Sequence, residues 1–91
     1  MVNYTVDEQL IEVTEVKNQK DYTFNIQVKS EEMRKRLKQV RSYFEENKDL
    51  TDAMFYSLQD GRYEVIVRDD MFITFLLIAF KYRCLESLAW Q

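Results

Sequence analysis

The sequence has no histidine and no proline, and it has one cysteine and one glycine among its 91 residues. Without histidine, the chain lacks the side chain most often used for acid–base catalysis and metal binding. The single cysteine, Cys84, excludes an internal disulfide, a cysteine zinc cluster and a dithiol redox pair. The single glycine, Gly61, cannot build a phosphate-binding loop or a dinucleotide fingerprint. The sequence therefore predicts a protein with no enzymatic activity, no cofactor and no metal site.

The scarcity of glycine and proline also limits the architecture. It leaves no room for a flexible linker or a long irregular loop. Apolar residues at 46% and charged residues at 32% are typical of an ordered globular chain, and the net charge of −3 favours no class of partner. We therefore expect residues 1–91 to form a single domain of regular elements joined by tight turns.

The sequence predicts a cytoplasmic protein that does not enter a membrane. The first residues lack the basic region and apolar run of a signal peptide. Residues 71–80 are apolar except Thr74, but Lys81 and Arg83 interrupt the run below the ~18 residues that a membrane span needs. A lone buried thiol at Cys84 suits a reducing compartment.

Residues 9–29 are predicted to form a β-hairpin. Residues 22–28 alternate apolar and polar side chains, as a half-buried strand does. If residues 18–21 form the turn, Ile11 lies opposite Val28 and Val13 lies opposite Ile26. The apolar sides of the two strands then agree, which supports this register.

A helix is predicted to follow and to end near Asn47. Ser30 is a typical N-cap, and Glu31 and Glu32 in the first turn complement the helix dipole. One inward stripe recurs at helical spacing, made of Met33, Leu37, Val40 and Phe44.

Residues 53–68 favour a second hairpin, because Asp60 and Gly61 tolerate the positive φ of a two-residue turn. Pairing outward from this turn places six residues on one apolar face: Met54, Tyr56, Leu58, Tyr63, Val65 and Val67. Phe55 and Ile66 then lie on the outer face. A short helix over residues 53–58 is the alternative that the sequence leaves open.

Residues 69–91 contain no glycine or proline and are predicted to form one long helix, with Asp69 as its cap and Asp70 complementing its dipole. One apolar stripe comprises Ile73, Leu77, Phe80, Cys84 and Leu88, and is predicted to face the sheet. The order ββαββα then predicts an α+β fold, with two ββα units forming a four-stranded antiparallel sheet and both helices on one face.

The best positive signal for function is a second apolar stripe on the same helix. The first helix has one narrow stripe, already used against the sheet, so little remains to cover the second. We expect this stripe to bind protein, either a second copy in a homodimer or another chain, as in a small regulatory protein. The predicted interface is Met71, Phe75, Ile78, Tyr82, Leu85 and Ala89.

The alternative is a nucleic-acid-binding regulator that uses the basic first helix. Arg34, Lys38 and Arg41 lie along one flank at helical spacing and form a possible contact line for phosphates. Neighbouring glutamates neutralise much of this charge, and no aromatic residues accompany it on the polar sheet face. We therefore expect any binding of nucleic acid to be weak and independent of sequence.

Overall fold

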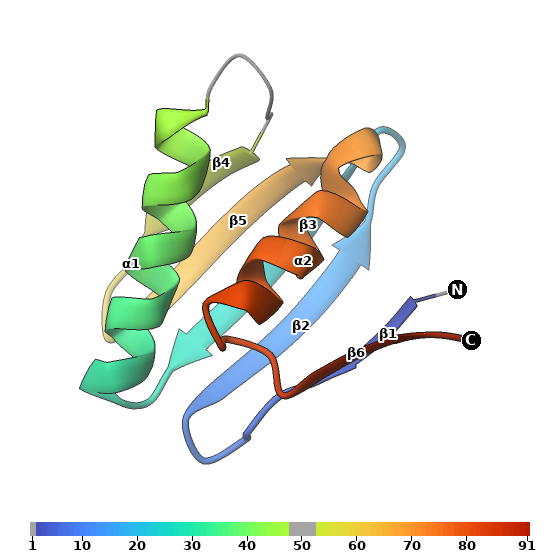
Figure 1. Ribbon diagram of the computed structural model, residues 1–91. Coiled ribbons are helices and arrows are strands. Elements are labelled where there is room, and N and C mark those ends of the chain that lie inside the picture. The colour runs from blue at the N-terminus through green and yellow to red at the C-terminus, as the bar shows by residue number, and fades with distance from the viewer. Residues whose placement is uncertain (1, 48–52) are drawn as a thin grey trace.

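The computed structural model describes residues 2–47 and 53–91 and has an α+β fold. Both helices lie on one face of a four-stranded antiparallel sheet with strand order β2-β3-β5-β4, and a separate ribbon pairs β1 with β6 (Figure 1). The elements are β1 (Val2–Thr5), β2 (Ile11–Lys17), β3 (Asp21–Val28), α1 (Glu31–Glu46), β4 (Ala53–Ser57), β5 (Arg62–Arg68), the 3-10 turn η1 (Asp69–Met71), α2 (Phe72–Lys81) and β6 (Ser87–Trp90). The predicted ββαββα order thus holds for β2 to α2, with one additional strand at each end.

The first hairpin and the first helix agree with the sequence. Ile11 pairs with Val28 and Val13 with Ile26, which is the predicted register. The Ser30 hydroxyl accepts a hydrogen bond from the Met33 amide at 3.1 Å, so it caps α1 as expected. All four residues of the α1 stripe are buried against the sheet.

Residues 53–68 form a hairpin, as predicted, but the predicted register of its two strands is wrong by one residue. The Arg62 amide donates to the Gln59 carbonyl at 3.2 Å, which closes the predicted two-residue turn at Asp60 and Gly61. The Leu58 amide also donates to the Arg62 carbonyl, at 2.8 Å, so Leu58 and Gln59 both lie opposite Arg62 and form a β-bulge. Gly61 lies close to β3: its carbonyl accepts from the Val28 amide, and a Cβ there would lie 2.8 Å from the Val28 oxygen. Both Asp60 and Gly61 have positive φ, as the turn chemistry predicts.

This shift reverses the two faces of β4, because neighbouring side chains in a strand point to opposite faces. Phe55 pairs with Val65 and turns toward the helices, where it contacts the ring of Phe44. The three β4 and loop residues predicted to face the core point outward instead and are 43–50% exposed: Met54, Tyr56 and Leu58.

The last helix is much shorter than predicted, because it ends at Lys81. The Arg83 amide donates to the Phe80 carbonyl at 3.0 Å, and the Cys84 amide donates to the Ala79 carbonyl at 2.9 Å. Together with the positive φ of Arg83 (64°), these two bonds form a Schellman motif. Glycine usually occupies this position, so the absence of glycine concealed the end of the helix.

The start of the last helix also differs from the prediction. Asp69 and Asp70 lie in η1, and neither η1 nor α2 has a side-chain cap. The Asp69 carboxylate instead accepts from Lys17 at 2.6 Å, and Asp70 pairs with Arg68 at 2.6 Å. The two carboxylates therefore fasten η1 to β2 and to the end of β5.

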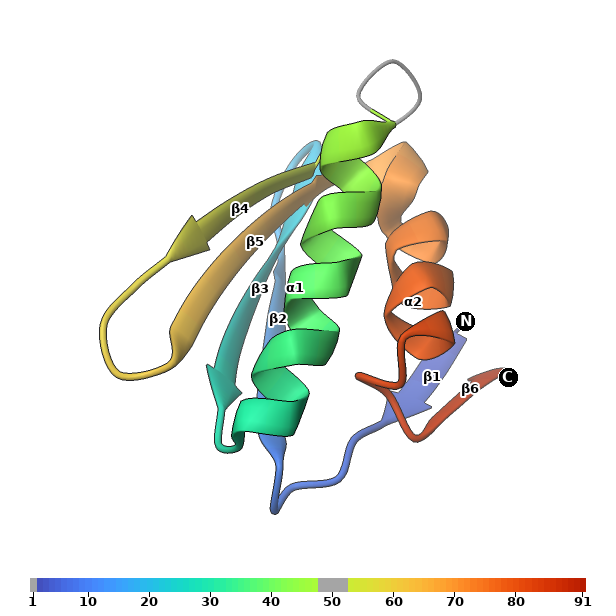
Figure 2. The same cartoon turned by 60° about the vertical axis from the view of Figure 1, so that its left-hand side comes forward.

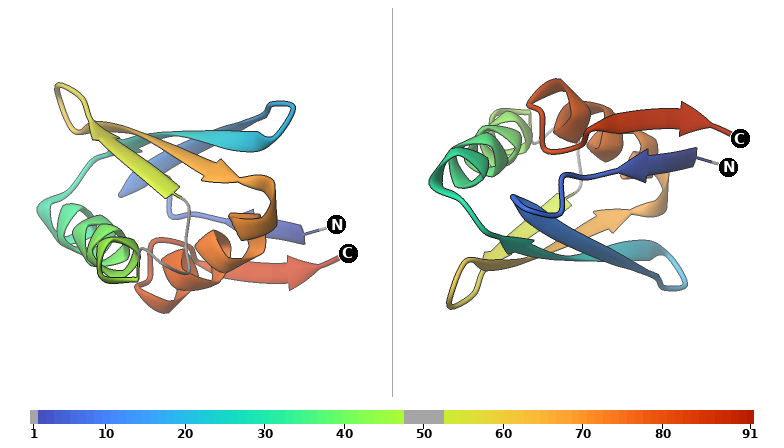
Figure 3. Two further views of the ribbon diagram at one scale, coloured as in Figure 1. Left: turned by 90° about the horizontal axis from the view of Figure 1, so that it is seen from above. Right: turned by 90° about the horizontal axis from the view of Figure 1, so that it is seen from below.

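The two terminal strands form a short ribbon beside α2 (Figure 3). Pairing runs from Val2 opposite Trp90 to Thr5 opposite Ser87. The Tyr4 hydroxyl donates to a Glu15 carboxylate oxygen at 2.5 Å and so ties the ribbon to β2. Figure 2 shows that the opposite face of the four-stranded sheet has no helix over it.

Candidate functional site

The six residues predicted to form the interface do not share one exposed surface. Phe75 is 3% exposed and Leu85 7% exposed, so both belong to the core. Three others, Met71, Ile78 and Tyr82, are partly buried against that core, and Ala89 lies beyond the helix in β6. The prediction of an exposed stripe through Phe75 and Leu85 is therefore wrong.

The physical reason is that α2 is rotated relative to the predicted orientation. Phe75, Leu76 and Ala79 face the sheet and α1, and the Phe75 ring centroid lies 4.7 Å from that of Phe24. The helix is apolar on nearly every side, so periodicity alone cannot choose its buried face. Leu77 and Phe80, predicted to face the sheet, are instead 53% and 44% exposed.

The exposed side of α2 continues onto the ribbon. An apolar groove of about 210 Å³ lies between α2 and the ribbon. Its lining residues are Val2, Ile73, Leu76, Leu77, Leu88, Ala89 and Trp90. Trp90 is 74% exposed at the end of this groove. We call Ile73, Leu77, Phe80, Leu88 and Trp90 the outer α2 surface.

Trp90 and the groove were missed because residues 87–90 were assigned to a helix. A signal was present in the sequence. Leu88 and Trp90 alternate with small residues, and Val2 and Tyr4 alternate with polar ones, as paired strands with one apolar face do.

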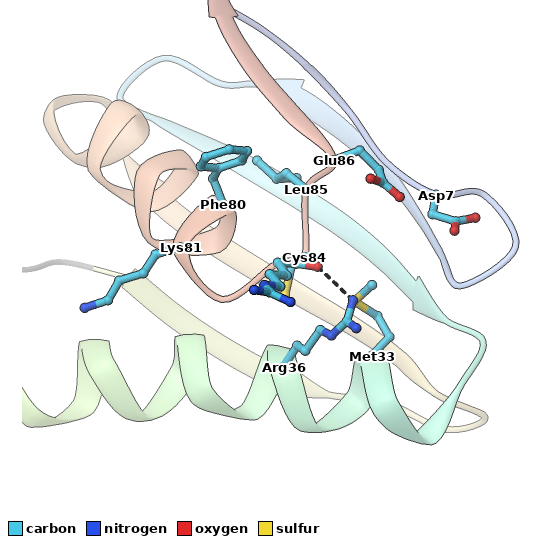
Figure 4. Close-up of a pocket in the computed structure, with 9 residues that line it drawn as sticks. Asp7, Met33, Arg36, Phe80, Lys81, Cys84, Leu85 and Glu86 are labelled. Carbon is cyan, nitrogen blue, oxygen red and sulfur yellow. Dashed lines mark hydrogen bonds between the residues drawn. The ribbon is translucent and has the colours of Figure 1, made fainter.

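A second hollow lies between α1, the end of α2 and the segment before β2, and has a volume of about 430 Å³ (Figure 4). Its lining is mixed, with three cations, two carboxylates and four apolar or sulfur-bearing side chains: Arg36, Lys81, Arg83, Asp7, Glu86, Met33, Phe80, Cys84 and Leu85. Asp7 and Glu86 gather at one end, and Lys81 lies at the other. We call this hollow the charged cleft.

Arg36 links two sides of the charged cleft, α1 and the turn after α2. Its guanidinium Nη1 donates to the Arg83 carbonyl at 3.2 Å, which fixes the turn after α2 to α1. Lys81 lies 5.9 Å from the Tyr43 ring centroid and 5.4 Å from that of Tyr82, within range for cation–π attraction. Since Phe80 belongs to both regions, the cleft forms a polar border to the outer α2 surface.

Cys84 is the one thiol in the charged cleft, but its environment suppresses its reactivity. Burial raises the pKa of the Cys84 thiol to about 12, although the nearby Arg36 charge acts in the opposite direction. The thiol is therefore protonated at neutral pH, whereas a reactive cysteine needs a lowered pKa. The Cys84 thiol is therefore not an activated nucleophile.

The predicted basic line of α1 is largely occupied by contacts within the chain. Arg34 pairs with Glu31 and donates to the Tyr63 hydroxyl, at 3.4 Å and 3.3 Å. Arg41 pairs with Glu45 at 2.7 Å. Lys38 is exposed. Two of the three cations are therefore committed within the chain.

Within residues 2–47 and 53–91, no group of three or more His, Cys, Asp or Glu side chains is placed to hold a metal ion. None of the helices described in these ranges has the length and apolarity to cross a membrane. No protein-family model, curated protein or solved structure matches the chain.

Proposed function

We propose that this protein is a non-enzymatic protein-binding module that forms a homodimer through the outer α2 surface. The observation that carries the proposal is the exposure of three large apolar side chains in one region, Leu77, Phe80 and Trp90. Clustered apolar residues of this size on a small protein mark contact surfaces, whereas scattered ones do not. Tryptophan in particular is enriched among residues that dominate binding energy.

The charged cleft supports a second copy of the chain as the partner. Protein interfaces commonly have an apolar centre with a polar rim, and the cleft supplies such a rim next to Phe80. Lys81 lies at one end of the cleft, and the carboxylates of Asp7 and Glu86 lie at the other. Across a two-fold axis, the cationic end of one copy can therefore meet the carboxylate end of its partner.

A regulatory role in the cytoplasm fits this proposal. Cys84 is buried and unpaired, which suits a reducing compartment. The proposed activity is binding alone, because the one thiol is held in its unreactive form.

Sedimentation velocity of the wild type and of a double variant, Leu77→Glu with Phe80→Glu, tests the proposal. We expect the variant to stay folded and to sediment as a smaller species than the wild type, because both side chains are exposed in the protomer and desolvated only in the proposed interface. Val16→Glu is the matched control, since Val16 is also 53% exposed but lies on β2. A wild type that stays monomeric at high micromolar concentration contradicts the proposal, as does equal dissociation by Val16→Glu.

A further inference from the structure

The free side of β4 is unprotected against pairing with another strand. β4 is the last strand in the order β2-β3-β5-β4, and no strand of the described residues pairs with its other side (Figure 2). Residues 53–58 carry no charge, whereas β2 at the opposite edge carries Glu12, Glu15 and Lys17. Charged side chains are a usual means of blocking edge-to-edge association, and β4 lacks them.

The hydrogen-bond pattern shows which backbone groups of β4 point away from the sheet. The Leu58 amide donates to the Arg62 carbonyl, which makes Leu58 and Arg62 a hydrogen-bonded pair. Such pairs alternate along an antiparallel ladder, so Tyr56 and Met54 also bond to β5. The N–H and C=O groups of Phe55 and Ser57 therefore point outward from the sheet edge.

The side chains beside this edge are symmetric about Tyr56. Met54 and Leu58 lie two residues on either side of it, on the same outer face of the sheet. The Tyr56 hydroxyl contacts the Met54 sulfur at 3.7 Å, so the row is continuous. In an antiparallel pair centred on Tyr56, each Met54 faces the Leu58 of the other copy.

We propose that β4 pairs antiparallel with β4 of a second copy, with the two-fold axis at Tyr56, to form one continuous eight-stranded sheet. In this register Phe55 of each copy exchanges two hydrogen bonds with Ser57 of the other, which satisfies the outward backbone groups. The apolar row formed by residues 54, 56 and 58 pairs with itself, and no like charges face each other within it.

This inference is independent of the function proposed above. β4 lies beneath the α1 side of the sheet, and the outer α2 surface lies beside the ribbon on the other side (Figures 1 and 3). Both surfaces can therefore be occupied at once. To test β4 without the contribution of the outer α2 surface, we use a variant that carries Leu77→Glu and Phe80→Glu and call it the parent.

Two charge variants of that parent, measured by sedimentation equilibrium, test the pairing. Met54→Lys with Leu58→Lys places like charges opposite each other across the axis. Met54→Lys with Leu58→Glu places opposite charges there. We expect the parent and the opposite-charge variant to dimerise, and the like-charge variant to dimerise at least about tenfold more weakly. Both variants introduce two charges at the same exposed positions, so they are matched.

Ser57→Pro is the second test, because proline removes an outward N–H and leaves the ladder to β5 intact. We expect it to abolish dimerisation of the parent while circular dichroism stays unchanged. A parent that is monomeric at high micromolar concentration overturns the β4 inference and leaves the outer α2 surface as the dimer interface. Equal association of the two charge variants also overturns it.

Discussion

At the scale of single residues, Arg83 determines where α2 ends, and it does so at an energetic cost. Its φ of 64° lies in the left-handed region, which is unfavourable for a residue with a Cβ. Its carbonyl is the group that accepts from Arg36, and this contact does not depend on the Arg83 side chain. Arg83→Gly should therefore stabilise the protein by about 0.5–1 kcal/mol, since relief of strain exceeds the added backbone entropy of the unfolded chain.

Urea denaturation of Arg83→Gly measures this gain. Lys81→Gly is the control, because Lys81 is the last residue of α2 and glycine within a helix should destabilise by up to about 1 kcal/mol. If both glycine variants lose stability, the left-handed turn is not the feature that ends the helix.

Cys84 makes stability depend on pH in the alkaline range. Its pKa is raised from 9.0 to about 12 by burial, so the folded protein keeps the thiol proton that the unfolded chain loses. The contribution is fully present below pH 9.0 and is lost as the pH rises toward 12, with a slope of up to about 1.4 kcal/mol per pH unit. Burial and Glu15 also raise the pKa of Tyr4, which adds a loss of the same sign.

Urea midpoints at pH 8, 9 and 10 for the wild type and Cys84→Ala test this dependence. The variant should be less stable at pH 8, because a buried side chain is truncated, but its stability should fall less steeply above pH 9. Parallel curves would show that the thiol has an ordinary pKa in the folded protein.

At the scale of elements, α2 has one face in the core and another in the outer α2 surface. The Phe75 ring contacts those of Phe24, Phe44 and Phe55, with centroid separations of 4.7, 5.9 and 6.2 Å. Phe75→Ala should therefore cost about 3–5 kcal/mol through lost burial and a residual cavity. Leu77→Ala should cost less than about 1 kcal/mol in the protomer, because Leu77 is already half exposed.

Thermal melts of the two variants over a hundredfold dilution series separate the faces. The loss for Phe75→Ala should be the same at every concentration. The loss for Leu77→Ala should appear mainly where the wild type is dimeric. A large loss for Leu77→Ala at the highest dilution would place Leu77 in the core.

Elements with one clear apolar side were predictable from the sequence. Both strands of the first hairpin alternate over several residues, so only one register buries both apolar sides, and α1 has one stripe and a capping serine. The second hairpin was not predictable to the residue, because nothing in its local pattern marks the bulge at Leu58 and Gln59. That bulge shifts β4 by one residue and exposes Met54, Tyr56 and Leu58.

The C-terminal elements depended on information that local pattern does not hold. The residue with a left-handed backbone conformation at the end of a helix is usually glycine, but here it is Arg83. The strands β1 and β6 have four residues each and are far apart in the chain, so neither had a visible partner. As a result, the sequence predicted an exposed apolar face on the last helix, but assigned that face to residues that the structure buries, such as Phe75 and Leu85.

At the scale of the whole molecule, the described elements leave the outer α2 surface and the free side of β4 uncovered. The helices cover one face of the sheet, and the ribbon covers only part of α2. The outer α2 surface and the free side of β4 are thus the two surfaces through which we propose that the protein contacts a second copy. The basic line of α1 offers less, since Arg34 and Arg41 already have partners within the chain.

Fluorescence of Trp90 tests the central claim most directly, because Trp90 is the only tryptophan in the sequence and belongs to the outer α2 surface. It is 74% exposed in the protomer and should be covered in the proposed dimer. On dilution of the wild type, we predict that the emission maximum moves to longer wavelength as the dimer dissociates. The variant with Leu77→Glu and Phe80→Glu should emit at the longer wavelength at every concentration. An emission maximum that does not change while sedimentation shows a dimer dissociating would contradict the claim, because the protein would then associate through another surface.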